Sequence, residues 1–232
     1  MCISLFSQEK VPEWFKKLPG KSADLSVGYT GQFLDKQLAR DVALYHAYKS
    51  LAKQQKVRLI FELKQFSDGT YRLIQPTFQQ IYYENILSQV KEQSIPLDSC
   101  FLQGRYFILL GYDHDKEFKI NGDTVNWGKK PEWVNSLPAS EDYVYGLGMV
   151  ANYSSWKNGW QDADEYARFA ACKNLRVKAS SIRKEKQVNG LTTLRSISRQ
   201  AVDTSIYNTK IIKRWYDLER DIFYSLCRAP QK

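Results

Sequence analysis

The sequence predicts an α+β fold of two tandem modules, each an antiparallel sheet with two helices on one face. Three observations predict it: a repeated octet, an alanine-lined helical segment after each copy, and pairs of strand-like segments joined by tight turns. A chain of 232 residues is long enough for two compact units of about 110 residues each. Aromatic residues make up 14% of it, which favours sheet-rich packing.

The clearest repeat is an octet that begins Pro-Glu-Trp. It is Pro-Glu-Trp-Phe-Lys-Lys-Leu-Pro from Pro12 and Pro-Glu-Trp-Val-Asn-Ser-Leu-Pro from Pro131, 119 positions later. A short strand-like segment ending in glycines follows each octet, over 25–31 in the first copy and 143–148 in the second. The same features in the same order indicate one structural unit used twice.

An alanine-lined helix comes next in both copies. Its stripe is Ala39, Ala43, Ala47 and Leu51 in the first copy, and Ala163, Ala167, Ala171 and Leu175 in the second. Residues four apart lie on one helix face, so small side chains there predict a helix close against a sheet. The two stripes are 124 positions apart, whereas the two octets are 119 apart. The difference predicts five extra residues in the second copy, in the aromatic loop 153–160.

Strand patterns follow each helix. Apolar residues alternate over 57–63, then a turn at 67–69 leads to a partner strand over 71–74, and Pro76 opens a second helix to about Gln93. The second copy is expected to place its middle strand at 176–187 and the matching turn at 189–190. Each copy closes on a hairpin, 97–102 with 105–110 and 211–217 with 221–226. Each module thus has the order β-α-β-β-α-β-β, with antiparallel neighbours.

These elements set the expected domain boundaries. We predict an N-terminal tether over 1–10, a first module over 11–114, a polar linker over 115–129 and a second module over 130–228. Polar, glycine-containing composition is typical of segments between domains. No apolar run of about 18 residues occurs, so no membrane-spanning helix is expected.

The net charge of +9 favours anionic partners without selecting one. Four basic side chains of the expected middle strand of the second module would project from one face and are candidate anion-binding residues: Arg176, Lys178, Lys184 and Lys186. The alternative is a solvated charged face. A nucleic-acid partner is not favoured, because the 104–109 segment reverses the basic–glycine order of RNA-binding strands and fills a face with aliphatic residues.

The sequence contains no recognisable catalytic set. Its two histidines are His46 in the alanine-lined helix and His114 in the linker, and nucleophile-elbow, phosphate-loop and zinc-protease motifs are absent. Gly146 and Gly148 match a relaxed dinucleotide fingerprint, but 152–155 separate them from the next helix, so we interpret them as a tight strand end. We expect no enzyme activity, no cofactor and no metal.

The cysteines also give no sign of a metal site. The four, at positions 2, 100, 172 and 227, lack Cys-x-x-Cys spacing and have no histidine near them in sequence. Three of them, Cys100, Cys172 and Cys227, lie in apolar segments, where a thiol packs as a small hydrophobic group.

The order of these features resembles the Lpp-twenty lipoprotein family of Gram-negative bacteria, once over 11–114 and again over 130–228. That family consists of small outer-membrane lipoproteins, usually with one copy of the unit, and its relatives include flagellar basal-disk components. The resemblance implies export and lipid attachment at Cys2, which would anchor the chain on the periplasmic side of the outer membrane. Without the resemblance, Cys2 would be interpreted as an ordinary residue of the N-terminal tail.

Two functions are therefore expected. The first is a non-enzymatic cell-envelope lipoprotein with a structural or assembly role through protein–protein contacts, with itself or other envelope proteins, in a flagellar or other outer-membrane-associated assembly. The second is a basic binding module for an anionic polymer, either nucleic acid or an envelope component. An enzyme is the third choice.

Overall fold

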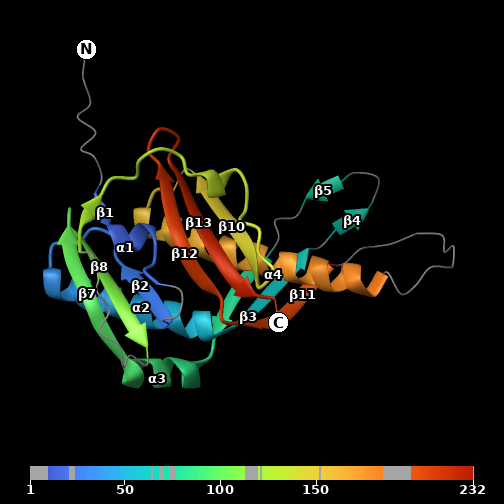
Figure 1. Ribbon diagram of the computed structural model, residues 1–232, viewed down its shortest axis with the longest axis horizontal. Helices are drawn as coiled ribbons and strands as arrows, with labels where there is room; N and C mark the ends of the chain where they lie inside the picture. The colour runs from blue at the N-terminus through green and yellow to red at the C-terminus, as the bar shows by residue number, and fades with distance from the viewer. Residues whose placement is uncertain are drawn as a thin grey trace, which may run out of the picture.

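The computed structural model describes residues 10–20, 24–63, 65–67, 71–73, 77–112, 120, 122–151, 153–184 and 200–231, with side chains throughout except over 61–78 and 176–203. Helices and antiparallel sheets are both present, so the predicted α+β class is confirmed. Figure 1 shows two three-stranded sheets side by side, with the long helices α2 and α4 behind them.

The first sheet has the strand order β2-β8-β7, and α2 packs across β2 and β8. The side chain of Asp35 caps α2 by accepting hydrogen bonds from the N–H groups of Gln37 and Leu38. Gln103 and Gly104 make the turn between β7 and β8 with positive φ angles of 50° and 76°. The elements are β2 (Asp24–Tyr29), α2 (Lys36–Gln55), β7 (Ser94–Leu102) and β8 (Arg105–Tyr112).

The second sheet repeats this arrangement. Its order is β10-β13-β12, and α4 packs across β10 and β13. In both halves a strand, a long helix and a terminal hairpin follow in this order, and the last strand of the hairpin is the central strand of the sheet. The elements are β10 (Tyr143–Ala151), α4 (Trp156–Lys184), β12 (Lys210–Asp217) and β13 (Ile222–Pro230).

A third sheet joins the halves. β11 pairs with β3 along its whole length, from Gln200 opposite Leu63 to Tyr207 opposite Lys56, and β3 also pairs with β6. The helix α3 packs on α2, and β4 and β5 form a small separate hairpin. These elements are β3 (Lys56–Leu63), β4 (Gln65–Ser67), β5 (Tyr71–Leu73), β6 (Thr77–Tyr82), α3 (Glu84–Gln93) and β11 (Gln200–Tyr207).

Four sequence predictions about secondary structure were wrong. The strand over 71–73 pairs with β4, not with the strand over 57–63, which lies between β6 and β11. Thr77–Tyr82 is a strand and the helix begins only at Glu84, because β3 offers this β-branched and aromatic segment a pairing partner. The expected strand from residue 176 is a continuation of α4 to Lys184, in a segment without Gly or Pro. Gln200–Tyr207 is a strand in the interval where the second module was expected to have its second helix.

The alanine stripes face the sheets as predicted. Ala39, Ala43 and Ala47 are fully buried, and so are their counterparts on α4. A Cβ atom on Gly28 would lie 1.9 Å from the backbone oxygen of Ala43, and one on Gly148 would lie 1.9 Å from that of Ala163. Both glycine–alanine pairs span the same number of residues. The predicted five-residue insertion was therefore wrong, and its error came from aligning the stripes one helical turn out of register.

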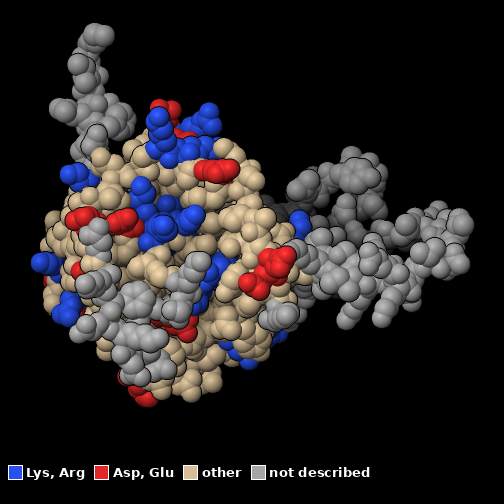
Figure 2. Space-filling view, in the orientation of Figure 1, with Lys and Arg blue, Asp and Glu red and all other residues tan. Residues whose placement is uncertain are grey.

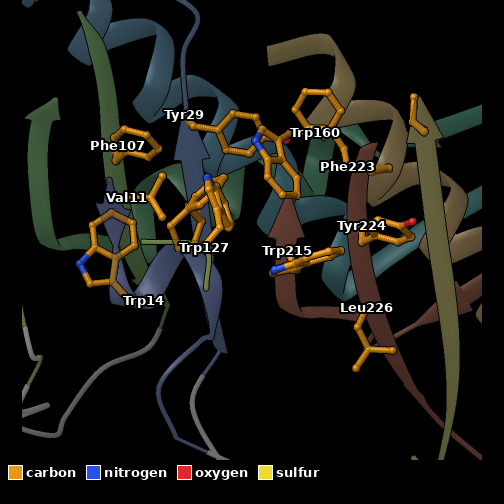
Figure 3. Packing of buried hydrophobic residues seen from close by; sticks show 14 of the residues in the cluster. Val11, Trp14, Tyr29, Phe107, Trp127, Trp160, Trp215, Phe223, Tyr224 and Leu226 are labelled. Atoms are coloured by element: carbon orange, nitrogen blue, oxygen red, sulfur yellow. The ribbon is translucent and has the colours of Figure 1, made fainter. Parts of the chain in front are cut away.

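The core is shared between the halves. Phe15 makes ring contacts with Tyr29 and Phe107 of the first half and with Trp160 of the second. Figure 3 shows Trp127 and Trp160 between the aromatic residues of the two sheets, and their ring centroids are 5.2 Å apart. Trp127 belongs to the segment expected as a polar linker, yet it is 2% exposed. That segment therefore contributes to the core.

Two single-turn helices precede the first strands of the two main sheets. They are α1 (Glu13–Lys16) and the 3₁₀ helix η1 (Glu132–Val134), and each carries the tryptophan of an octet. Trp14 and Trp133 are both buried in the shared core. The strand β1 (Val11–Pro12), just before α1, pairs with β9 (Thr124–Val125).

Candidate functional site

A polar cavity of about 230 Å³ lies between α2 and α4, with β6 contributing to its wall. Two helices supply most of the lining, and each does so from positions spaced i, i+3, i+4 and i+7, which share one helix face. That face of each helix lies beside the alanine stripe that packs on the sheet. The lining residues are His46, Lys49, Ser50, Lys53, Gln80, Tyr82, Gln161, Asp164, Glu165 and Arg168.

The carboxylate of Asp164 is already occupied by protein donors. Arg214 donates to it from Nε at 3.1 Å and from Nη2 at 2.8 Å, and Ser225 donates from Oγ at 2.6 Å. The Tyr29 hydroxyl donates from 3.3 Å. With side chains 6% and 2% exposed, Asp164 and Arg214 form a buried, hydrogen-bonded ion pair.

Protonation in this cluster follows from burial and charge. Burial opposes the charged form of Arg214, but the neighbouring Asp164 carboxylate outweighs it, so the pKa of Arg214 lies above its ordinary value. Burial and the Asp164 carboxylate together raise the pKa of Tyr29 well above 10.0. The guanidinium is therefore charged and the phenol is neutral at ordinary pH.

Lys53 and Glu165 link the two helices across the cavity wall. Their Nζ and Oε1 atoms are 2.6 Å apart, and both side chains are partly exposed, at 17% and 31%. Burial lowers the pKa of Lys53, and the nearby Glu165 carboxylate opposes this shift. The two acidic side chains of the cavity thus each have a basic partner.

Arg168 differs from the other charged residues of the cavity. Its side chain is 3% exposed, yet in the described part of the chain no carboxylate lies within ion-pair distance of it. Its Nη2 atom donates to the Ser50 hydroxyl at 3.4 Å, and its Nε atom has no hydrogen-bond partner among the described residues. The buried Oε1 atom of Gln80 is likewise unpaired there.

His46 lies in the cavity wall as a neutral donor. Its Nδ1 atom accepts a hydrogen bond from the backbone N–H of Tyr29 at 3.3 Å, which leaves the proton of the neutral ring on Nε2. Burial, then the charges of Lys49, Lys53, Lys157 and Arg214, lower its pKa well below 6.5. The cavity therefore carries several N–H donors and a surplus of positive charge, which suits an anion.

A second cavity, of about 210 Å³, opens between the loop after α1 and β12. We call its four basic lining residues the basic groove: Lys17, Lys210, Lys213 and Arg228. Lys17 and Lys213 form an isolated antiparallel bridge, so their backbones lie side by side. The Lys210 ammonium pairs with Asp24 at 2.5 Å. Figure 2 shows lysine and arginine side chains gathered in the middle of this face.

An apolar groove of about 390 Å³ adjoins the edge strand β10. β13 is the single strand that pairs with β10 in the described part of the chain. The sequence of β10 contains neither a charged residue nor proline, and Met149 on it is 58% exposed. The groove is lined by 137–140, 143–145 and Asn174, and Leu137 in it is 38% exposed.

The anion-binding residues expected from the sequence do not form the arrangement on which that expectation rested. Arg176, Lys178 and Lys184 belong to α4, where positions 176 and 178 point to opposite sides, so they cannot share the face of a strand. Their side chains lie outside the described residues, and so do Lys186, Cys2 and His114 entirely. The described basic groove involves none of them.

The cysteines and glycines have structural positions. Cys172 and Cys227 are buried, as predicted, and Cys100 is partly buried. Gly146 and Gly148 lie inside β10 rather than at its end, and the backbone of α4 fills the space beside them. Among the described residues there is no cluster of three or more potential metal ligands, and no helix is long and apolar enough to cross a membrane.

Comparisons with protein-family models, with curated proteins and with solved structures give no match to the chain. The resemblance to the Lpp-twenty lipoproteins is thus a prediction from the sequence. Three structural features bear on the function: the polar cavity, the basic groove and the edge of β10.

Proposed function

We propose that the chain is a non-enzymatic cell-envelope protein with an assembly role through protein–protein contacts. The observation that carries this proposal is the open edge of β10, a nine-residue strand without charge or proline. Soluble proteins usually protect such an edge with charged residues, prolines or a covering segment, because it can pair with another chain. β10 contains no charged residue and no proline.

The open part of the edge can be located on the strand. The backbone N–H of Gln231 donates to the Asp142 carbonyl, which therefore points toward β13. Successive carbonyls of a strand point to alternate sides, so those of Tyr143 and Tyr145 point away from β13. The side chains of Gln231 and Asn174 already donate to these two carbonyls. The edge available to a partner is therefore the second half of β10, around Met149.

A second copy of this chain is the partner that we propose for the edge. Two β10 strands can pair antiparallel about a two-fold axis, and such an interface must be complementary to itself. An uncharged strand meets this requirement, because no like charges are brought together. The neighbouring apolar groove then receives side chains from the partner, as in other cases of strand addition.

Sedimentation equilibrium of the wild type, Met149→Lys and Leu218→Lys tests this interface. We expect a wild-type dimer and at least tenfold weaker dimerisation for Met149→Lys, because a lysine would face its own copy across the axis. Leu218 is 46% exposed in the turn after β12, so Leu218→Lys is the matched control and should dimerise like the wild type. A wild type that stays monomeric, or equal effects of both substitutions, would refute the self-association.

The location on the periplasmic side of the outer membrane is part of the proposal and rests on the Lpp-twenty resemblance. A diacylated Cys2 followed by a tether to the fold would anchor the protein. Mass spectrometry of the N-terminal peptide from the native envelope fraction measures the modification directly. An unmodified Cys2 thiol there would exclude the lipid anchor and leave the interface proposal unaffected.

The basic groove supports a second candidate, the binding of an anionic polymer or lipid surface. Its four basic side chains come from three segments, and the nearest acidic partner, Asp24, neutralises one of them. Vesicles containing anionic phosphatidylglycerol should bind the protein at low salt, with affinity falling steeply as salt rises. Lys213→Glu should weaken binding, and the sequence-predicted pair Lys184→Glu and Lys186→Glu serves as a comparison. Binding weakened only by the latter pair would assign it to the sequence-predicted residues.

A further inference from the structure

We propose that the cavity between α2 and α4 is a binding site for a small oxyanion of the phosphate type, held by Arg168. This site is distinct from the β10 edge and from the basic groove, and it does not depend on the proposed assembly role. The geometry that points to it is a buried guanidinium in the wall of a polar cavity, whose Nε atom has no acceptor among the described residues.

Charge balance is the first argument. Within the cavity lining, Asp164 is neutralised by Arg214 and Glu165 by Lys53, which leaves Arg168 and Lys49 without a carboxylate in the described residues. An unpaired buried charge is unfavourable by several kcal/mol, and proteins normally supply a counter-charge to such groups. A bound anion is the counter-charge that this cavity can accept.

The arrangement of donors is the second argument. Arg168 lines the cavity from α4, whereas His46, Lys49 and Ser50 line it from α2, so both helices bring donor-bearing side chains to it. Donors converging from different directions suit a tetrahedral oxyanion, which accepts hydrogen bonds on every oxygen. Gln80 Oε1 offers an acceptor for a protonated oxygen of the same anion.

Space is the third argument. A volume of about 230 Å³ is several times the roughly 30 Å³ that one water molecule takes in the liquid. The cavity can therefore hold a small oxyanion together with water. The residues that line this cavity come from three elements packed around it.

The proposal can be tested by measuring the binding of inorganic phosphate to the full chain. Titration calorimetry and thermal unfolding at constant ionic strength should show phosphate binding and a melting temperature that rises with phosphate. Arg168→Met should bind about tenfold to a hundredfold more weakly, since it removes a charge-assisted hydrogen bond. Lys213→Met removes a positive charge outside the cavity and should match the wild type.

A stability measurement separates binding from a structural role of Arg168. Without phosphate, Arg168→Met should unfold at the same or a higher temperature than the wild type, because it removes an unpaired buried charge. With phosphate, the order should reverse. Should Arg168→Met fail to fold, Lys49→Met tests the site from the partly exposed side of the cavity.

Three results would overturn the proposal. They are the absence of phosphate binding by the wild type at about 10 mM, equal affinity for chloride or acetate, and a phosphate response that survives in both Arg168→Met and Lys49→Met. The first two would leave the cavity as a hydrated polar space. The last would place the anion elsewhere, and the Lys213→Met protein would show whether it sits in the basic groove.

Discussion

Arg214 on β12 and Asp164 on α4 form a buried ion pair with two parallel hydrogen bonds, at 3.1 Å and 2.8 Å. The same guanidinium lies 4.9 Å from the ring centroid of Phe15 and donates to the Phe15 carbonyl at 3.3 Å. One side chain thus connects the helix and sheet of the second half with α1 of the first. The ion pair forms part of the wall between the polar cavity and the aromatic core.

Removing one member of this pair should destabilise the fold strongly. Asp164→Ala leaves the Arg214 charge buried without a carboxylate, and we expect a loss of about 3–5 kcal/mol in the free energy of unfolding, measured with urea. Glu165→Ala, in the partly exposed pair with Lys53, is the matched control and should cost about 1 kcal/mol or less. The double variant Asp164→Ala with Arg214→Met should lose less than the sum of the single losses. A loss near that of the control would show that the pair is dispensable.

The closeness of α2 and α4 to their sheets can be tested at the glycines. Gly28→Ala and Gly148→Ala would place a Cβ atom 1.9 Å from a helix backbone oxygen, so the helix has to move. We expect each to cost about 3 kcal/mol or more in unfolding free energy, above the usual range for added methylene groups because backbone is displaced. Gly31→Ala is the control, since its Cβ would meet only Lys157 at 3.9 Å. Equal stabilities of the three variants would contradict the close packing.

Local patterns predicted the elements that depend on local information. The two terminal hairpins and the buried alanine stripes correspond to observed features. The third sheet could not be predicted from local patterns, because β3 and β11 are far apart in sequence. Nothing in the residues of either strand identifies the other as its pairing partner. The helical continuation of α4 was missed because the middle strand of the first copy was transferred to residues 176–187 of the second.

The polar cavity could not be predicted for two physical reasons. Charged residues at i, i+3, i+4 and i+7 on a single helix normally indicate a solvated face, and the cavity arises only because two such faces oppose each other. Arg214 follows Lys213 in a strand that otherwise alternates. A β-bulge between Ile211 and Lys213 turns Arg214 rather than Lys213 toward α4, and no sequence feature marks that bulge.

The described thiols should react slowly in the folded protein. Burial, and then the Asp98 charge, raise the pKa of Cys100 to about 12, and burial raises that of Cys227 to about 12. In a Cys2→Ser background, Ellman's reagent at about pH 8 should modify these thiols only after unfolding, because the thiolate is the reactive form. Leu218→Cys, in the exposed turn after β12, supplies an accessible thiol as the control. Modification of Cys227 as fast as that control would contradict its burial in the core.

The pH dependence of stability should contain a contribution from His46. Its pKa in the folded protein is lowered well below 6.5, chiefly by burial and then by Lys49, Lys53, Lys157 and Arg214. Below about pH 6.5 the unfolded chain therefore takes up a proton that the folded protein does not. The stability contribution is complete above the unfolded pKa and is lost as pH falls toward the folded pKa.

His46→Asn isolates this contribution, because its side-chain oxygen can still accept the Tyr29 N–H while no titrating group is left. Urea unfolding from about pH 7.5 to about pH 5 should show a steeper loss of stability for the wild type than for the variant. His114 is present in both proteins, so its own titration cancels in the comparison. Equal slopes would mean that His46 titrates alike in the folded and unfolded chains, and its ring would then not be enclosed by the cationic wall of the cavity.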